Sequence, residues 1–300
     1  MATTTPTCTI TDLRKLIKDS GYPFELSVAE TLMTQNYDVK LSHHFFNPLR
    51  QQDSELDILA TRNFEFETKR LGHVRCVLEL AIECKDNSLP YVLFGFPSPT
   101  PRPPGIVDTD SFYMKVRSTS DKFANYFAIP SLGDSRGSEP LNTKPHLHQF
   151  KGAFRFHQAA AVEIQNGKQK LHVTERLRNA LNGLAGYVEY AQDSWIKNKK
   201  ALDGMSYDPM IWVSYLVLIH GGEHYRYTGQ SSLEPAYHTT LFTSFNSGSS
   251  SIPLTIDFIK HSDLLSSLKT IEGSFDVLSK HILRYLEPSP KPLTKRTYSF

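Results

Sequence analysis

The sequence predicts a mixed α/β domain with helices packed on a small sheet, and two observations lead to this class. First, segments in which apolar residues recur every three or four positions are interspersed with segments in which they recur every second position. Second, 39% of the 300 residues are hydrophobic and 21% are charged, which is the composition of a folded chain and excludes a disordered protein. No composition shift and no internal repeat divides the chain, so we expect one domain over residues 1–300.

Each expected helix and strand follows from its local apolar spacing. Spacings of three and four residues predict helices over 10–17, 23–35, 147–164, 177–195 and 264–286. Ser20 and Gly21 end the first of these helices, and Pro23 suits the first turn of the second. Alternating or continuous apolar runs predict strands over 37–46, 55–62, 73–85, 212–220 and 252–260.

The segments between these elements are rich in proline or serine. Five prolines within residues 96–105 favour a stiff surface connector over a ligand for a proline-binding module. The expected organisation is a core over 10–95 and 145–287, a Pro-rich irregular insertion over 96–144, a flexible Ser-rich loop over 244–251 and a basic, mobile tail over 288–300.

The charge balance and the cysteines narrow the class of protein. A net charge of +2 neither demands nor excludes a polyanionic partner. The longest apolar run, 211–219, is about half of the ~20 residues that a membrane helix needs, and the polar segment 1–9 lacks the features of a signal peptide. Three cysteines without CxxC spacing argue against a disulfide framework and a cysteine-rich zinc site. We therefore expect a soluble, cytoplasmic protein without a membrane partner.

Glu25 is an acidic residue on an otherwise apolar helix face. At offsets of three, four and seven residues it neighbours Val28, Ala29 and Leu32, so its carboxyl group is expected to point inward. A buried carboxylate is costly unless a hydrogen bond, a cation or a metal compensates its charge.

Asp57 and Glu83 are expected to face each other across a hairpin. Asp57 lies in a strand pattern, where aspartate is disfavoured. Alternation along the next strand places Glu79, Ala81, Glu83 and Lys85 on one face. If the hairpin is centred on Arg70, paired residue numbers sum to about 140, which sets Asp57 opposite Glu83.

Two opposed carboxylates destabilise a sheet, so a cation is expected between them. A small set of hard oxygen ligands suits Mg²⁺ or Mn²⁺, which keep their other coordination positions for water and substrate phosphate. Lys85 beside such a metal could orient or deprotonate the attacking water, or neutralise charge in the transition state. Glu25 could supply an outer ligand. The four residues together predict hydrolysis of a phosphodiester.

The order of these residues resembles that of the PD-(D/E)XK nuclease superfamily: Glu25 on a first helix, Asp57 on a strand, then Glu83-Cys84-Lys85 at a strand end. The text from Gly21 to Val39 is similar to the opening helix of Mrr-like restriction endonucleases and archaeal Holliday-junction resolvases. The resemblance covers about residues 20–95. It implies a restriction-endonuclease-like mixed sheet flanked by helices, to which this chain is expected to add a long insertion after the catalytic strand.

The chain departs from that superfamily's pattern in three places. Leu56 precedes Asp57 where proline is common, and residues 43–48 lack a glycine-rich approach to the strand. About sixty irregular residues separate Lys85 from the next expected helix, which in the superfamily follows sooner.

Other polar groups are weaker candidates. His220 and His224 match the HxxEH pattern of inverted zinc peptidases, but Gly221 and Gly222 favour a strand end and turn over the required helix. Gln158 could approach the carboxylates from a helix. The remaining candidates are loop histidines and a basic helix end, namely His43, His44, His146, His148, Trp195, Lys197, Lys199 and Lys200.

The sequence thus predicts a magnesium- or manganese-dependent endonuclease that acts on nucleic acid, DNA in preference to RNA. Asp57 and Glu83, with Glu25, would bind the metal, and Lys85 would activate water. Two alternatives remain: a catalytically inactive nucleic-acid or protein-binding module on the same fold and, more remotely, a zinc peptidase that uses His220 and His224. A homodimer is a candidate state of assembly.

Overall fold

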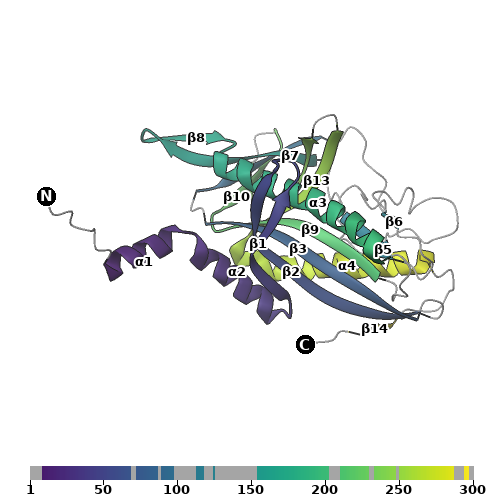
Figure 1. The fold of residues 1–300 in the computed structure, drawn as a ribbon. Coiled ribbons are helices and arrows are strands. Elements are labelled where there is room, and N and C mark those ends of the chain that lie inside the picture. Colours follow the sequence, from purple (N-terminus) through teal and green to yellow (C-terminus); the bar gives the residue numbers. More distant parts are fainter. Residues whose placement is uncertain are drawn as a thin grey trace.

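A strongly bent sheet forms the centre of the protein (Figure 1). The computed structural model describes residues 9–68, 72–86, 89–97, 113–117, 124–125, 154–202, 210–229, 233–247, 250–286 and 294–296. Four α-helices occur in these ranges: α1 (Ile10–Asp19), α2 (Tyr22–Thr34), α3 (Glu175–Leu202) and α4 (Leu264–Leu286). The strands are β1 (Asp38–Asn47), β2 (Gln52–Thr68), β3 (Gly72–Lys85), β4 (Tyr91–Pro97), β5 (Tyr113–Arg117), β6 (Ala124–Asn125), β7 (Phe154–Gln165), β8 (Lys168–His172), β9 (Met210–His220), β10 (His224–Tyr227), β11 (Leu233–Ala236), β12 (His238–Ser247), β13 (Ser250–Lys260) and β14 (Thr294–Arg296).

The sheet is mixed, which confirms the predicted α/β class, but the expectation of a small sheet is wrong, since fourteen strands in the described residues join it. Its main strand order is β1-β2-β3-β9-β13-β12-β7-β4-β10-β11. β1, β2 and β3 pair in antiparallel fashion, whereas β3, β9 and β13 run parallel to one another. Parallel neighbours bury both faces, and the long apolar run of β9 is buried accordingly.

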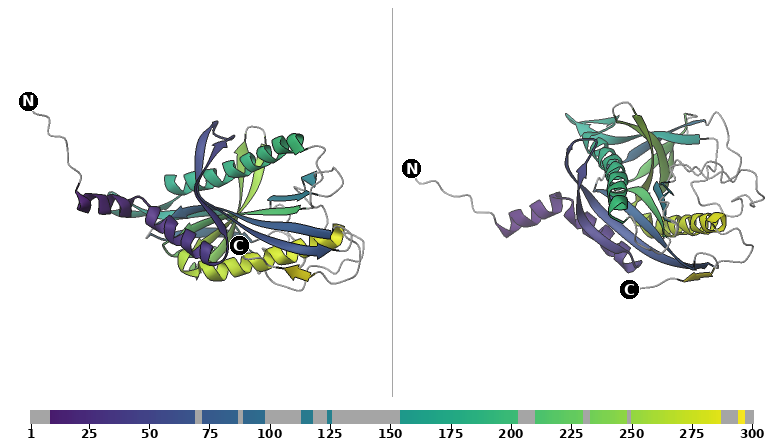
Figure 2. Two further views of the ribbon diagram at one scale, coloured as in Figure 1. Left: turned by 60° about the horizontal axis from the view of Figure 1, so that its bottom comes forward. Right: turned by 45° about the vertical axis from the view of Figure 1, so that its right-hand side comes forward.

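Helices cover both faces of the sheet (Figure 2). α2 and α4 pack on one face, where Leu32 and Phe275 join the same apolar cluster as Leu80. α3 packs on the other face, where Leu184 joins Ala81. The alternation along β3 therefore separates its side chains as predicted: Leu78, Leu80, Ile82 and Cys84 face α2 and α4, and Ala81 faces α3.

The helix predicted over 147–164 is wrong. Residues 154–165 form β7, and 147–153 lie outside the described residues. Asn166 and Gly167, with φ of 52° and 73°, make the tight turn that joins β7 to β8, which is the turn chemistry of a hairpin. The consecutive buried residues Ala159, Ala160 and Ala161 lack a period of two because both faces of this strand are covered.

Three segments expected to be irregular contain strands. Phe96 and Pro97 end β4, and β5, which lies within the expected insertion, pairs with β9. Residues 244–247 and 250–251 belong to the β12–β13 hairpin instead of a flexible loop. In the expected tail, β14 pairs with β2 and sets Arg296 opposite Glu65 in register. The rest of the insertion and of the tail, apart from 124–125 in β6, lies outside the described residues.

Within the part of the chain that the structure describes, every helix is too short or too polar to cross a lipid bilayer.

Candidate active site

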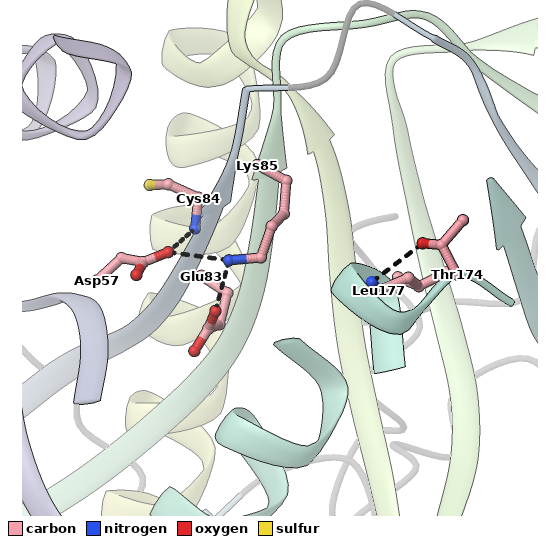
Figure 3. A network of polar contacts seen from close by, with 6 residues as sticks. All are labelled: Asp57, Glu83, Cys84, Lys85, Thr174 and Leu177. Atoms are coloured by element: carbon pink, nitrogen blue, oxygen red, sulfur yellow. Dashed lines mark hydrogen bonds and ion pairs between the residues drawn. The ribbon is translucent and has the colours of Figure 1, made fainter. Parts of the chain in front are cut away.

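The β2–β3 hairpin brings Asp57 to the end of β3. Ile58 pairs with Ile82 and Leu59 with Ala81, so the predicted register, in which paired numbers sum to 140, is confirmed. Asp57 immediately precedes Ile58 in the chain, so it lies one residue beyond the end of this ladder. Its Oδ2 accepts a hydrogen bond of 2.6 Å from the backbone N–H of Cys84 (Figure 3). The strand end thereby holds one carboxylate oxygen in a defined position.

Lys85 bridges the two carboxylates of the hairpin. Its Nζ donates to Glu83 Oε2 at 2.8 Å and to Asp57 Oδ2 at 3.2 Å (Figure 3). Burial disfavours the ammonium form, but the two carboxylates outweigh this effect and raise the pKa of Lys85 above its ordinary value. Lys85 is therefore a positively charged donor at neutral pH, and both carboxylates converge on its charge.

Glu83 and Glu25 are acids that titrate near neutral pH. Burial is the largest cause that raises the pKa of Glu83 to about 7, since only 6% of the residue is exposed. Burial, followed by the negative charge of Asp57, also raises the pKa of Glu25 to about 7. Glu25 lies in the first turn of α2, whose N-terminal cap is Gly21 with a φ of 85°. The beginning of α2 thus carries Glu25 into the electrostatic field of Asp57 and Lys85.

Helix α3 closes the site from the other side, which the sequence analysis did not anticipate. Thr174 caps this helix, since its Oγ1 accepts from the N–H of Leu177 at 3.2 Å (Figure 3). Two turns further on, Gly183 lies so close to β3 that a Cβ added to it would stand 2.6 Å from Glu83 Oε1. Gly186 approaches Asn47 in the same manner. Two glycines at i, i+3 lie on one face of a helix, and this spacing in the sequence could have indicated that a sheet approaches α3 closely.

Gly183→Ala is expected to disturb Glu83. The added methyl group should displace the carboxylate or lift α3, destabilise the fold by about 1 kcal/mol after the gain in helix propensity, and weaken Mn²⁺ binding about tenfold. Thermal unfolding and titration calorimetry would measure both effects. Gly273→Ala on α4 is the matched control, because nothing lies within 4 Å of the added Cβ, and it should stabilise the protein slightly. If both variants behave alike, α3 does not position Glu83.

The donors present fit a hard divalent cation. Asp57 Oδ2 and Glu83 Oε2 both lie within reach of one positive charge, the Lys85 ammonium. In the described ranges, no group of three or more His, Cys, Asp or Glu side chains is close enough to hold a metal. Mg²⁺ is commonly held by one or two protein carboxylates and completes its shell with water and phosphate. The pair Asp57 and Glu83 meets that requirement, and Glu25 as a third ligand stays a prediction.

His220 and His224 lie at a strand end and a strand start, not on a helix, as Gly221 and Gly222 indicated. Both are buried, and His220 Nε2 lies 2.9 Å from His224 Nδ1. Burial lowers the pKa of His220 to about 4 and that of His224 to about 3. An HxxEH zinc site requires two histidines on one face of a helix, and His220 and His224 do not form such a pair. Their rings are instead hydrogen-bonded to each other.

The other candidates lie apart from the carboxylates or cannot be placed. Gln158 is exposed on β7, which is separated from β3 by β9, β13 and β12. His43 packs against Tyr187, and His44 is exposed beside Glu55. The side chains of Trp195, Lys197, Lys199 and Lys200 and the residues His146 and His148 lie outside the described part.

The chain matches no family model, no curated protein and no solved structure. Its function has to be inferred from the side chains that the fold brings together.

Proposed function

We propose that this protein is a metal-dependent nuclease of the restriction-endonuclease-like type, which hydrolyses phosphodiester bonds of nucleic acid in the cytoplasm, with DNA preferred over RNA. One observation carries the proposal: a partly buried lysine at a strand end bridges two carboxylates, 2.8 Å from Glu83 and 3.2 Å from Asp57. A lysine and two acids with this convergence can hold a divalent cation, a water molecule and a phosphate in one place.

The charge of each side chain would determine its role in the reaction. Asp57 and Glu83 would hold Mg²⁺ or Mn²⁺, which supplies a Lewis acid for the phosphate oxygens. The backbone N–H of Cys84 fixes Asp57. Lys85, which donates to both carboxylates, would orient the attacking water and neutralise charge that develops on the phosphate.

Hydrolysis forms one bond from the water oxygen to phosphorus and breaks the bond from phosphorus to the ester oxygen. The water loses a proton to an acidic side chain of the site, and the leaving oxygen gains a proton. Glu25, with its pKa of about 7, can hold or release a proton beside Asp57 and Lys85 at neutral pH.

The experiment that tests this proposal is cleavage of plasmid DNA, single-stranded DNA and RNA by the purified full chain with Mg²⁺, Mn²⁺ or EDTA. Cleavage that requires the metal supports a nuclease. Absence of cleavage on all three substrates, together with absence of Mn²⁺ binding in calorimetry, contradicts it. That outcome favours a non-catalytic binding module in which Lys85 stays paired with its two carboxylates.

Metal binding is expected to strengthen as the pH rises through about 7. Below this value Glu83 and Glu25 are largely protonated, and a metal must displace the proton from its ligand. The affinity for Mn²⁺ should rise about fivefold from pH 6 to 7 for each of these acids that is a ligand, and level off by pH 8. Calorimetry at these three pH values measures the trend, and Glu83→Gln should flatten it. An affinity independent of pH in the wild type would mean that neither acid is a ligand.

A further inference from the structure

Helix α1 presents an apolar stripe to solvent. Four of its residues share one side of the helix and are 48–70% exposed, namely Ile10, Leu13, Leu16 and Ile17. The helix contains no buried residue. It extends away from the sheet and from the other helices in each view (Figures 1 and 2).

A helix of this length is marginal without a partner. Its ten residues fall below the ~12–15 that an isolated helix needs in water. A capping box formed by Thr9 and Asp12 stabilises its first turn. The rest of the stabilisation in an amphipathic helix normally comes from burial of its apolar side, which the described residues of this chain do not supply.

Helix α2 carries a second exposed stripe. Tyr22, Leu26 and Met33 are 49–57% exposed and share one side of α2. The buried residues Val28, Ala29 and Leu32 lie beside this stripe on the helix and pack against the sheet. α1 leads away from α2 and does not fold back over this stripe (Figure 1).

The charges beside the two stripes are complementary. On α1, Arg14 follows Ile10 by four residues and Lys18 follows Arg14 by four, which places both cations along one border of the stripe. On α2, Glu30 follows Leu26 by four residues and precedes Met33 by three, and it is exposed. The border of the α1 stripe that carries Arg14 and Lys18, as opposed to the border that carries Asp12 and Asp19, can therefore dock beside Glu30 on the stripe of α2.

We propose that this protein forms a two-fold symmetric dimer in which α1 of each copy packs on α2 of the other copy. One chain carries both complementary surfaces. In a two-fold dimer each copy therefore covers both surfaces of the other, and the same contact between α1 and α2 occurs twice. In this dimer the apolar stripe of α1 is buried against the stripe of α2 of the second copy. Arg14 and Lys18 then lie beside Glu30 of the second copy.

The first test is the state of assembly of the full chain by light scattering and sedimentation at micromolar concentration. The wild type should be a dimer. The double variant Leu13→Asp, Ile17→Asp should dissociate at least about 30-fold more readily, because two charges enter the buried centre of the interface. Leu265→Asp is the matched control, since this leucine on α4 is 47% exposed, and it should leave the dimer unchanged.

The second test is a charge exchange. Arg14→Glu with Lys18→Glu, and separately Glu30→Lys, should each weaken the dimer about two- to fivefold, and the triple variant should restore it. A monomeric wild type, a dimer that survives Leu13→Asp with Ile17→Asp, or a dimer insensitive to all charge reversals would overturn the proposal. So would a monomer that binds anionic lipid vesicles through the same stripe.

Discussion

Replacement of Lys85 by methionine is expected to reduce metal-dependent cleavage about 1000-fold while the protein stays folded. Methionine matches the length of the aliphatic part of lysine but removes the ammonium group that bridges Glu83 and Asp57. Without that charge, the attacking water and the transition-state phosphate lose their cationic partner. The rate of plasmid nicking under saturating Mg²⁺ measures the effect, and circular dichroism confirms the fold.

The matched control for this substitution is Lys280→Met. Lys280 on α4 also makes an ion pair, with Asp276 at 2.7 Å, but lies far along the chain from the hairpin. Because partly exposed ion pairs of this kind contribute at most about 1 kcal/mol, cleavage by this variant should equal that of the wild type. Equal cleavage by the Lys85 and Lys280 variants would remove Lys85 from the reaction.

Glu83→Gln and Asp57→Asn are expected to weaken Mn²⁺ binding more than about 100-fold, with cleavage lost in parallel. Each amide keeps the shape of the side chain but cannot donate an anionic oxygen to the metal. Calorimetry measures the affinity. Glu55→Gln is the control, because Glu55 is an exposed acid on the same strand as Asp57. Wild-type affinity in both amide variants would contradict the assignment of the ligands.

Glu83→Gln is also expected to change metal binding and the free energy of unfolding in opposite directions. A carboxyl group whose pKa is raised from 4.5 to about 7 in the fold contributes stability at low pH that is lost as the pH rises from about 4.5 to 7. Glutamine imitates the protonated acid, so at pH 8 this variant should be roughly 1–3 kcal/mol more stable than the wild type while it binds less metal. A variant less stable at pH 8 would show that the ionised carboxylate stabilises the fold.

Long, strongly periodic segments were predictable from local spacing. α4 begins and ends at the predicted residues, Leu264 and Leu286, and the register of the β2–β3 hairpin follows from a turn near Arg70. Consecutive buried alanines before Asn166 carry no period that separates helix from strand, so β7 could not be recognised locally. β5 and β14 were missed because such short strands depend on the neighbours with which they pair.

The sequence by itself determined which carboxylates share one end of the hairpin, because strand alternation and the position of the turn near Arg70 are local properties: they set Asp57 and Glu83 at the same end. Only the tertiary structure decided that Lys85 bridges them, that α3 approaches Glu83 at Gly183, and that the stripe of α1 faces solvent. These features depend on how elements distant in the chain pack together, and packing distances are set by the shapes of both partners, which local periodicity does not contain.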